Sequence, residues 1–290
     1  MFWKFILKLV KENNHVQIAA EFLGFTHFKL KELNKILTYS RYLFDYLKHG
    51  DWRSVIASVN YVINKSSHRS DRTIETSIGK FYCRKNTNDF QFANLYYEWG
   101  VKKFILKRLD DFSVFIDAGS CIGEYCILLA KKNKKCFAFE PVEDNIHSFE
   151  KNLELNGLQN IIKILPFGLG EENYQTSYLF NPVNTGASRI TNVPALGQNI
   201  AEIRKLDSII PDLAIHTDEY IFMKLDIEGM EAEAIRGAAE FIKKYVNLTL
   251  IIEDKHTGQT PIKDALSEIA AFEFGRVDEY NIYAKRISKC

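Results

Sequence analysis

The chain has 290 residues, 46% of them hydrophobic, and a formal net charge of +1, so it can bury a full core and carries no excess charge for holding nucleic acid. Its five cysteines are odd in number and lack paired metal-ligand spacing, which predicts reduced, structural thiols. No apolar run is long enough to span a bilayer, and the lysine-interrupted start lacks a signal-peptide cleavage site, so we expect a cytoplasmic protein.

Residues 1–72 are predicted to form a helical extension. Apolar residues recur at helical spacing over 2–10, with lysines on the opposite side, and two further stripes over 30–47 and 55–63 predict a second and a third helix. The first stripe is basic and carries Trp3, so residues 1–12 suit weak contact with a membrane surface. Packing on the neighbouring helices, or on a second subunit in a homo-oligomer, is the preferred interpretation.

The pattern changes near residue 73, where we place the start of a second domain that runs to residue 290. Alternating residues over 73–84 predict a pair of strands with a turn near Gly79, and residues 90–109 are expected to form one helix. Apolar strands and helices then alternate, which predicts a doubly wound, mostly parallel sheet with right-handed crossovers. The expected strands are 113–117, 136–140, 161–166, 219–225, 247–253 and 281–286, and the expected helices are 123–133, 142–156, 229–243 and 261–271. The last strand follows residues 272–277 after a short polar break, which suits a closing antiparallel hairpin.

The first strand of this series leads into a predicted cofactor site. It ends at Asp117, and the turn after it contains Gly119 and Gly123, which allow the backbone to approach a ligand closely. A helix begins at Glu124 and presents free N–H groups, and the next strand ends at Glu140, whose carboxylate suits the two hydroxyls of a ribose.

The spacing of this turn favours S-adenosylmethionine over a dinucleotide. A dinucleotide site needs Gly-x-Gly-x-x-Gly, whereas this chain has Asp-x-Gly-x-x-x-Gly, with Ser120 and Cys121 in place of the middle glycine. Asp117 at the strand end would repel a pyrophosphate but suits an ammonium group. An NAD-dependent oxidoreductase is therefore the weaker alternative.

The stretch 171–206 is long for a connection between two strands and offers many neutral hydrogen-bonding groups. Such groups suit a polyhydroxylated acceptor, so a sugar or glycan hydroxyl is the leading candidate and a polyketide or other secondary-metabolite hydroxyl the second. A surface hairpin would have a similar composition. The residues concerned are Asn181, Asn184, Thr185, Ser188, Arg189 and Asn192.

Acidic residues follow two strands that are expected to be neighbours. Asp226 and Glu228 follow the fourth strand, and Glu253, Asp254 and His256 follow the fifth, so they should meet at the edge where ligands bind in open parallel sheets. Acids at the start of a helix also interact favourably with its dipole, which explains Glu228 only in part. Asp226 is a candidate general base, or with Glu253 and Asp254 a ligand of a divalent cation such as magnesium, and the spacing favours neither role.

Several strings of this chain resemble the FkbM-type family of S-adenosylmethionine-dependent O-methyltransferases. The resemblance covers about residues 80–287. Its strings are Phe115-Ile-Asp-Ala-Gly-Ser-Cys-Ile-Gly123, Phe139-Glu-Pro141, Asn184-Thr-Gly-Ala-Ser188, Arg204-Lys-Leu-Asp-Ser208, Lys224-Leu-Asp-Ile-Glu-Gly-Met-Glu231 and Ile251-Ile-Glu253. The family implies a class I methyltransferase fold, a Rossmann-like, seven-stranded, mostly parallel sheet with its last strand antiparallel. Residues 1–72 fall outside the resemblance.

The resemblance also implies roles for individual residues. Asp117, Gly119 and Gly123 would hold the methionine part of S-adenosylmethionine and Glu140 its ribose, while residues near Phe167 and Gly168 would lie by the adenine. The predicted cofactor-binding set is completed by Ser120, Pro141 and Asp226, and the predicted catalytic set is Asp226, Glu228, Glu253 and His256. A non-catalytic module that binds S-adenosylmethionine is a further alternative, disfavoured because Asp117, both glycines and Glu140 are all present.

Overall fold

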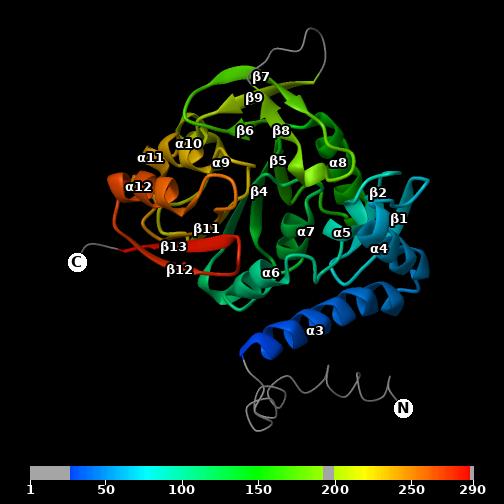
Figure 1. Cartoon of the computed structure of the whole chain (residues 1–290). Coiled ribbons are helices and arrows are strands. Elements are labelled where there is room, and N and C mark those ends of the chain that lie inside the picture. The colour runs from blue at the N-terminus through cyan, green and yellow to red at the C-terminus, as the bar shows by residue number, and fades with distance from the viewer. Residues whose placement is uncertain (1–26, 192–198, 288–290) are drawn as a thin grey trace.

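A seven-stranded sheet forms the centre of the molecule (Figure 1). The computed structural model describes residues 27–191 and 199–287, so the predicted stripe at residues 2–10 and Asn192 lie outside the described residues. The strand order is β12–β13–β11–β10–β3–β4–β5, and β13 is antiparallel to both of its neighbours while β10, β11, β3, β4 and β5 pair in parallel. This confirms the class I methyltransferase fold and its closing hairpin. The strands are β3 (Val114–Ala118), β4 (Lys135–Phe139), β5 (Ile162–Leu165), β10 (Ile221–Leu225), β11 (Leu248–Glu253), β12 (Phe272–Arg276) and β13 (Asn281–Arg286).

Two apolar cores cover the two faces of this sheet. Along β3, Val114 and Ile116 face one core and Phe115 faces the other, because successive strand residues point to opposite faces. Helices α5 (Asp89–Phe92), α6 (Trp99–Leu106), α7 (Glu124–Ala130) and α8 (Glu143–Asn156) pack on the Phe115 side. Helices α9 (Ile210–Leu213), α10 (Glu231–Arg236), α11 (Ala239–Lys244) and α12 (Gln259–Ile269) pack on the other. Short 3₁₀ turns at Leu109–Asp111, Thr185–Ala187 and Leu206–Ile209 complete the helical segments.

Two of the predicted helices are broken in the structure. The helix expected over 90–109 is divided into α5 and α6, because residues 94–98 form turns between them. The helix expected over 229–243 is divided into α10 and α11 at Gly237, where a Cβ atom would lie 1.9 Å from the carbonyl oxygen of Gly170. The side chain of Asp207 caps the N-terminus of α11, because its carboxylate accepts hydrogen bonds from the N–H groups of Glu240 and Phe241.

The stretch 171–206, which was expected to be a long connection, contributes three strands to a second, four-stranded sheet, and the fourth strand lies just before it. Its strands are β6 (Gly168–Leu169), β7 (Tyr174–Leu179), β8 (Arg189–Thr191) and β9 (Ile200–Arg204), in the order β6–β9–β7–β8. The β6–β9 pair is parallel and the other pairs are antiparallel. This sheet lies at the end of the molecule opposite α3 in Figure 1.

The second and third predicted helices are confirmed as α3 (His27–Lys48) and α4 (Trp52–Asn64), and the predicted strand pair as β1 (Arg72–Glu75) and β2 (Lys80–Cys83). β2 is attached to α8, because the N–H of Tyr82 donates to Asn152 Oδ1 at 2.7 Å. None of the described helices is both long enough and apolar enough to cross a membrane. The four cysteines within the described residues are buried and unbridged.

Candidate active site

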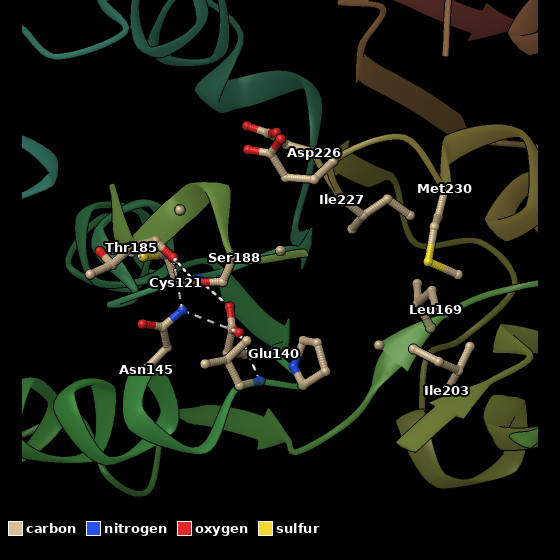
Figure 2. Close-up of a pocket in the computed structure, with 16 residues that line it drawn as sticks. Cys121, Glu140, Asn145, Leu169, Thr185, Ser188, Ile203, Asp226, Ile227 and Met230 are labelled. Carbon is tan, nitrogen blue, oxygen red and sulfur yellow. Dashed lines mark hydrogen bonds between the residues drawn. The ribbon is translucent and has the colours of Figure 1, made fainter. Parts of the chain in front are cut away.

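A hollow that is open to solvent lies at the carboxyl ends of β3, β4 and β10 (Figure 2). Glu140 and Asn145 approach it from one side, Asp226 from another, and a third side is apolar. Six of the predicted site residues line it, namely Gly119, Glu140, Pro141, Gly168, Asp226 and Glu228. The apolar side is formed by Leu169, Ile203, Ile227 and Met230, none of which was predicted from the sequence.

Gly119 sets how closely β3 and β10 approach at this edge. Its φ is +82°, and a Cβ atom at this position would lie 1.9 Å from the carbonyl oxygen of Asp226. The N–H of Asp226 donates to the carbonyl of Ala118 at 3.1 Å, so the two strand ends stay paired up to the turn. Glycine is therefore required here both by the backbone angle and by the facing strand.

Glu140 is buried at the side of the hollow, and both of its carboxylate oxygens accept hydrogen bonds. Oε2 accepts from the N–H of Cys121 at 2.7 Å, and Oε1 accepts from the N–H of Val142 at 2.9 Å and from Asn145 Nδ2 at 3.4 Å. Burial raises the pKa of Glu140 to about 7, although these backbone donors act in the opposite direction. A carboxylate has about four acceptor positions, so a hydroxyl of a ligand can still bind.

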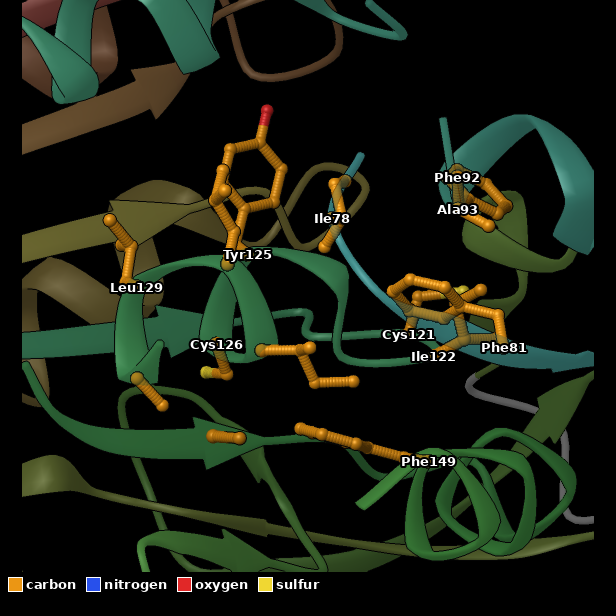
Figure 3. Packing of buried hydrophobic residues seen from close by; sticks show 14 of the residues in the cluster. Ile78, Phe81, Phe92, Ala93, Cys121, Ile122, Tyr125, Cys126, Leu129 and Phe149 are labelled. Atoms are coloured by element: carbon orange, nitrogen blue, oxygen red, sulfur yellow. The ribbon is translucent and has the colours of Figure 1, made fainter. Parts of the chain in front are cut away.

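Four of the predicted cofactor residues do not line the hollow, and their roles stay predictions. Asp117 and Ser120 are buried behind it, and Asp117 Oδ1 and Ser120 Oγ have no hydrogen-bond partner among the described residues. A Cβ atom on Gly123 would lie within 2.3 Å of the Phe149 ring, so packing alone accounts for this glycine. Figure 3 shows Phe149 in the apolar cluster with residues of α7 and β2. Phe167 is buried against Phe139, with ring centroids 5.6 Å apart.

Lys224 is a buried cation between two of the carboxylates. Its Nζ lies 2.8 Å from Asp226 Oδ2, and its neighbour in the adjacent strand β3 is Asp117. Burial acts to lower the pKa of Lys224, but the charges of Asp226, Glu98 and Asp117 outweigh it and hold the pKa above its ordinary value. Burial disfavours the charged form of Asp117 as well and raises its pKa to about 6, while the positive charge of Lys224 acts to lower this pKa. The ammonium group therefore stays charged and balances the negative charge at this edge.

The other predicted catalytic residues lie beside Asp226. His256 Nε2 is 3.1 Å from Glu228 Oε2, and Glu228 has a φ of +56° in the turn after β10. Glu253 ends β11, the strand next to β10, and burial together with the charges of Asp226 and Glu228 raises its pKa to about 8.

The alternative role of these acids, as ligands of a divalent cation, finds no support in the described residues. Asp254 pairs with Arg276, and among the described residues no group of three His, Cys, Asp or Glu side chains is arranged as metal ligands. Glu231 has a structural role, because it accepts hydrogen bonds from the N–H groups of Ile227 and Gly229.

Part of the site escaped sequence reasoning. Asn145 contacts Glu140 and also donates to the carbonyl of Thr185 at 3.3 Å, so it joins the β4 end to the stretch after β7. The one feature of the sequence that could have indicated Asn145 is its position five residues after Glu140. Of the predicted acceptor-binding residues, Thr185 and Ser188 line the hollow. Asn181 Oδ1 accepts from the N–H groups of Val183 and Asn184, and Asn184 Oδ1 accepts from the side chain of Asn88.

Comparisons with known proteins identify the family to which the chain belongs. A family model described as the methyltransferase FkbM domain matches residues 117–280. Methyltransferase 1 of Beauveria bassiana (strain ARSEF 2860) is 26% identical over 148 residues, which cover 44% of this chain and 59% of that protein. Among solved structures, the FkbM methyltransferase of Methylobacillus flagellatus KT is 21% identical with a TM-score of 0.44, covering 60% of this chain and 44% of that one. An S-adenosylmethionine-dependent O-methyltransferase of Thermotoga maritima is 16% identical with a TM-score of 0.41, covering 76% and 78%. The chain thus spans about half the length of the first two proteins.

Proposed function

Because the chain belongs to the FkbM methyltransferase family, we propose that it transfers a methyl group from S-adenosylmethionine to a hydroxyl of a sugar, glycan or related polyhydroxylated acceptor. The observation that carries this proposal is the hollow itself. It brings the Gly119 turn and Glu140 to one part of a single cavity and the carboxylates of Asp226 and Glu228 to another. A ribose hydroxyl can donate to Glu140, and the apolar side around Met230 suits the adenine ring.

S-adenosylmethionine supplies an electrophilic methyl group on a sulfonium, and the acceptor oxygen must be held in line with it and lose its proton. We assign the proton to Asp226, whose carboxylate faces the hollow and lies 2.8 Å from Lys224 Nζ. We assign the orientation of the acceptor hydroxyls to Glu228, which lines the hollow and pairs with His256.

The charge of this edge supports a neutral acceptor. The carboxylates of Asp226 and Glu228 both line the hollow and offer hydrogen-bond acceptors there. Several hydroxyls can donate to such a surface at once, whereas a phosphorylated acceptor would be repelled by it.

Two measurements test the proposal. Calorimetry with S-adenosylmethionine and with NAD separates the cofactors, and we expect heat of binding with S-adenosylmethionine alone; binding of neither would favour a non-catalytic module without a cofactor. Transfer of a labelled methyl group is then measured with a panel of sugars, glycans, sugar nucleotides and flat phenolic compounds. Methylation of the phenolic compounds alone would show that the acceptor class is wrong while the cofactor is right.

A further inference from the structure

Helix α4 presents its apolar side to solvent. The residues that it buries are small or polar, Ser54, Ala57 and Ser58. Val55 and Tyr61 pack partly against the core, but the other large apolar residues are exposed, and Val62 and Ile63 near the end of the helix are 74% and 75% exposed. An amphipathic helix of a globular protein normally has the opposite arrangement. The exposed apolar residues of α4 are Trp52, Ile56, Val59, Val62 and Ile63.

Polar contacts, two of them buried, hold α4 in this orientation. Asp51 caps the helix by accepting from the N–H of Ser54 at 3.2 Å, and it also pairs with Arg72 at 2.8 Å. Ser54 Oγ lies 3.1 Å from His68 Nε2, and near the other end the hydroxyl of Tyr61 donates to the carbonyl of Val183 at 3.0 Å. Rotation of α4 to bury its apolar side would break these bonds and leave buried polar groups unpaired.

Helix α3 extends this surface, and the charges around it are basic. Its exposed apolar residues are Ile36, Tyr39, Phe44 and Leu47. Lys48, Arg53 and Lys65 are exposed, whereas Asp45 and Asp51, the acids here whose side chains are described, are buried. Residues 1–72 contain 12 Lys and Arg against six Asp and Glu, a net charge of +6, and residues 73–290 contain 26 against 31, a net charge of −5.

We propose that α3 and α4 form a docking surface for an anionic lipid bilayer. Exposed apolar residues with a tryptophan, flanked by Lys and Arg, are the features that place a helix at the boundary between headgroups and acyl chains. The positive charge opposes a contact between two copies of this face and contact with the lysine-bearing residues 2–11, whereas anionic lipids attract all of these segments. This contact would be peripheral and does not depend on the proposed reaction.

The test is co-sedimentation of the full chain with vesicles of phosphatidylcholine alone and with vesicles that also contain phosphatidylglycerol. We expect binding to the anionic vesicles and its loss at high salt. Val62→Asp combined with Ile63→Asp should weaken binding about tenfold or more, because two apolar side chains no longer enter the boundary region. Lys48→Glu combined with Lys65→Glu should weaken binding to the anionic vesicles through charge alone.

The matched control is Leu179→Asp combined with Ile200→Asp, on β7 and β9 of the small sheet. These side chains are 66% and 65% exposed, and this variant should bind vesicles like the wild type. Unchanged thermal midpoints show that all the variants are folded. The proposal is overturned if the wild type remains in the supernatant with both vesicle types, or if the Val62 and Ile63 variant binds as well as the wild type. A wild-type dimer that this variant dissociates, without vesicle binding, would also overturn it and assign the surface to a second copy.

Discussion

Asp226 is the residue on which the proposed chemistry depends most directly. It lines the hollow and pairs with Lys224, so a carboxyl oxygen stands where the acceptor proton must be received. Asp226→Asn keeps the size of the side chain and removes the base, and we expect turnover to fall about 100-fold or more. Affinity for S-adenosylmethionine should change far less, because the base acts mainly in the transition state.

Steady-state rates of methyl transfer and calorimetry measure these two effects separately. Asp254→Asn is the matched control, because Asp254 follows the adjacent strand but pairs with Arg276. It should retain nearly wild-type turnover. An Asp226→Asn enzyme with the wild-type rate would remove Asp226 from the mechanism.

Glu140 holds the turn after β3 as well as facing the proposed ribose position, so the substitution that tests its part in binding must preserve the turn. Replacement by Ala would leave the N–H groups of Cys121 and Val142 without their acceptor, so lost binding could reflect a collapsed turn. Glu140→Gln keeps one acceptor oxygen and removes the charge. We expect it to weaken binding of S-adenosylmethionine by about 1–3 kcal/mol, measured by calorimetry. Glu143→Gln, on the exposed first turn of α8, should bind like the wild type, and equal affinities of all three proteins would refute the ribose assignment.

At the scale of elements, two glycines with similar backbone angles allow the cost of a strained backbone angle to be separated from the cost of a steric clash. Gly119 has a φ of +82° and faces the carbonyl of Asp226, whereas Gly157, at the end of α8, has a φ of +67° and nothing within 4 Å of a Cβ atom. Gly157→Ala should therefore cost about 1 kcal/mol of unfolding free energy. Gly119→Ala should cost at least about 3 kcal/mol, because the ends of β3 and β10 must also separate.

Denaturant unfolding of both variants measures the difference. Gly119→Ala should also abolish detectable binding of S-adenosylmethionine, while Gly157→Ala should leave it intact. Equal destabilisation by the two substitutions would mean that only the backbone angle matters at Gly119.

The elements that sequence could predict are those whose pattern is local. β3 and β10 are buried at every position, and the three apolar residues that begin each strand made them recognisable, as the spacing of α8 and α12 did. The break between α10 and α11 was not predictable, because it depends on contact between Gly237 and the distant Gly170. The small sheet was missed for the same reason, since its strands pair across the connection and carry a mixed pattern.

The site residues that could be predicted are likewise those with a local pattern in the sequence. Glu140, Gly119 and Asp226 end strands or follow them directly, so topology alone brings them to one edge. Asn145 and the apolar residue Met230 reach the hollow through the way helices pack, which local spacing does not encode. The ion pair between Lys224 and Asp226 was likewise found only in the structure, although both residues belong to one recognised string.

At the scale of the whole molecule, the helical extension and the sheet domain are joined through buried contacts. Tyr46 of α3 is fully buried, and its hydroxyl donates to the carbonyl of Phe90 at 2.6 Å. Asp45 accepts from the N–H groups of Ser77 and Leu95. Removal of residues 1–70 would therefore expose core as well as delete the proposed docking surface, so point variants are the sharper tests of that surface.

Raised carboxyl pKa values at the cofactor edge make stability and ligand binding depend on pH in opposite directions. Burial raises the pKa of Glu140 from an ordinary value of 4.5 to about 7, so the folded protein binds this proton more tightly than the unfolded chain. The stabilisation is complete below the unfolded pKa and is lost as pH rises through about 7. Between about pH 5.5 and about pH 8.5, the wild type should lose about 2 kcal/mol relative to Glu140→Gln, in which this proton is absent.

The comparison cancels every other titrating group that the two proteins share, including His68, whose pKa burial lowers to about 4. Thermal midpoints of both proteins without ligand, measured across this range, should therefore converge or cross as pH rises. Binding of S-adenosylmethionine by the wild type should strengthen over the same range, because an ionised Glu140 is the better acceptor for ribose hydroxyls. A constant difference in midpoint would show that Glu140 is already ionised throughout, and an affinity independent of pH would separate it from the ribose.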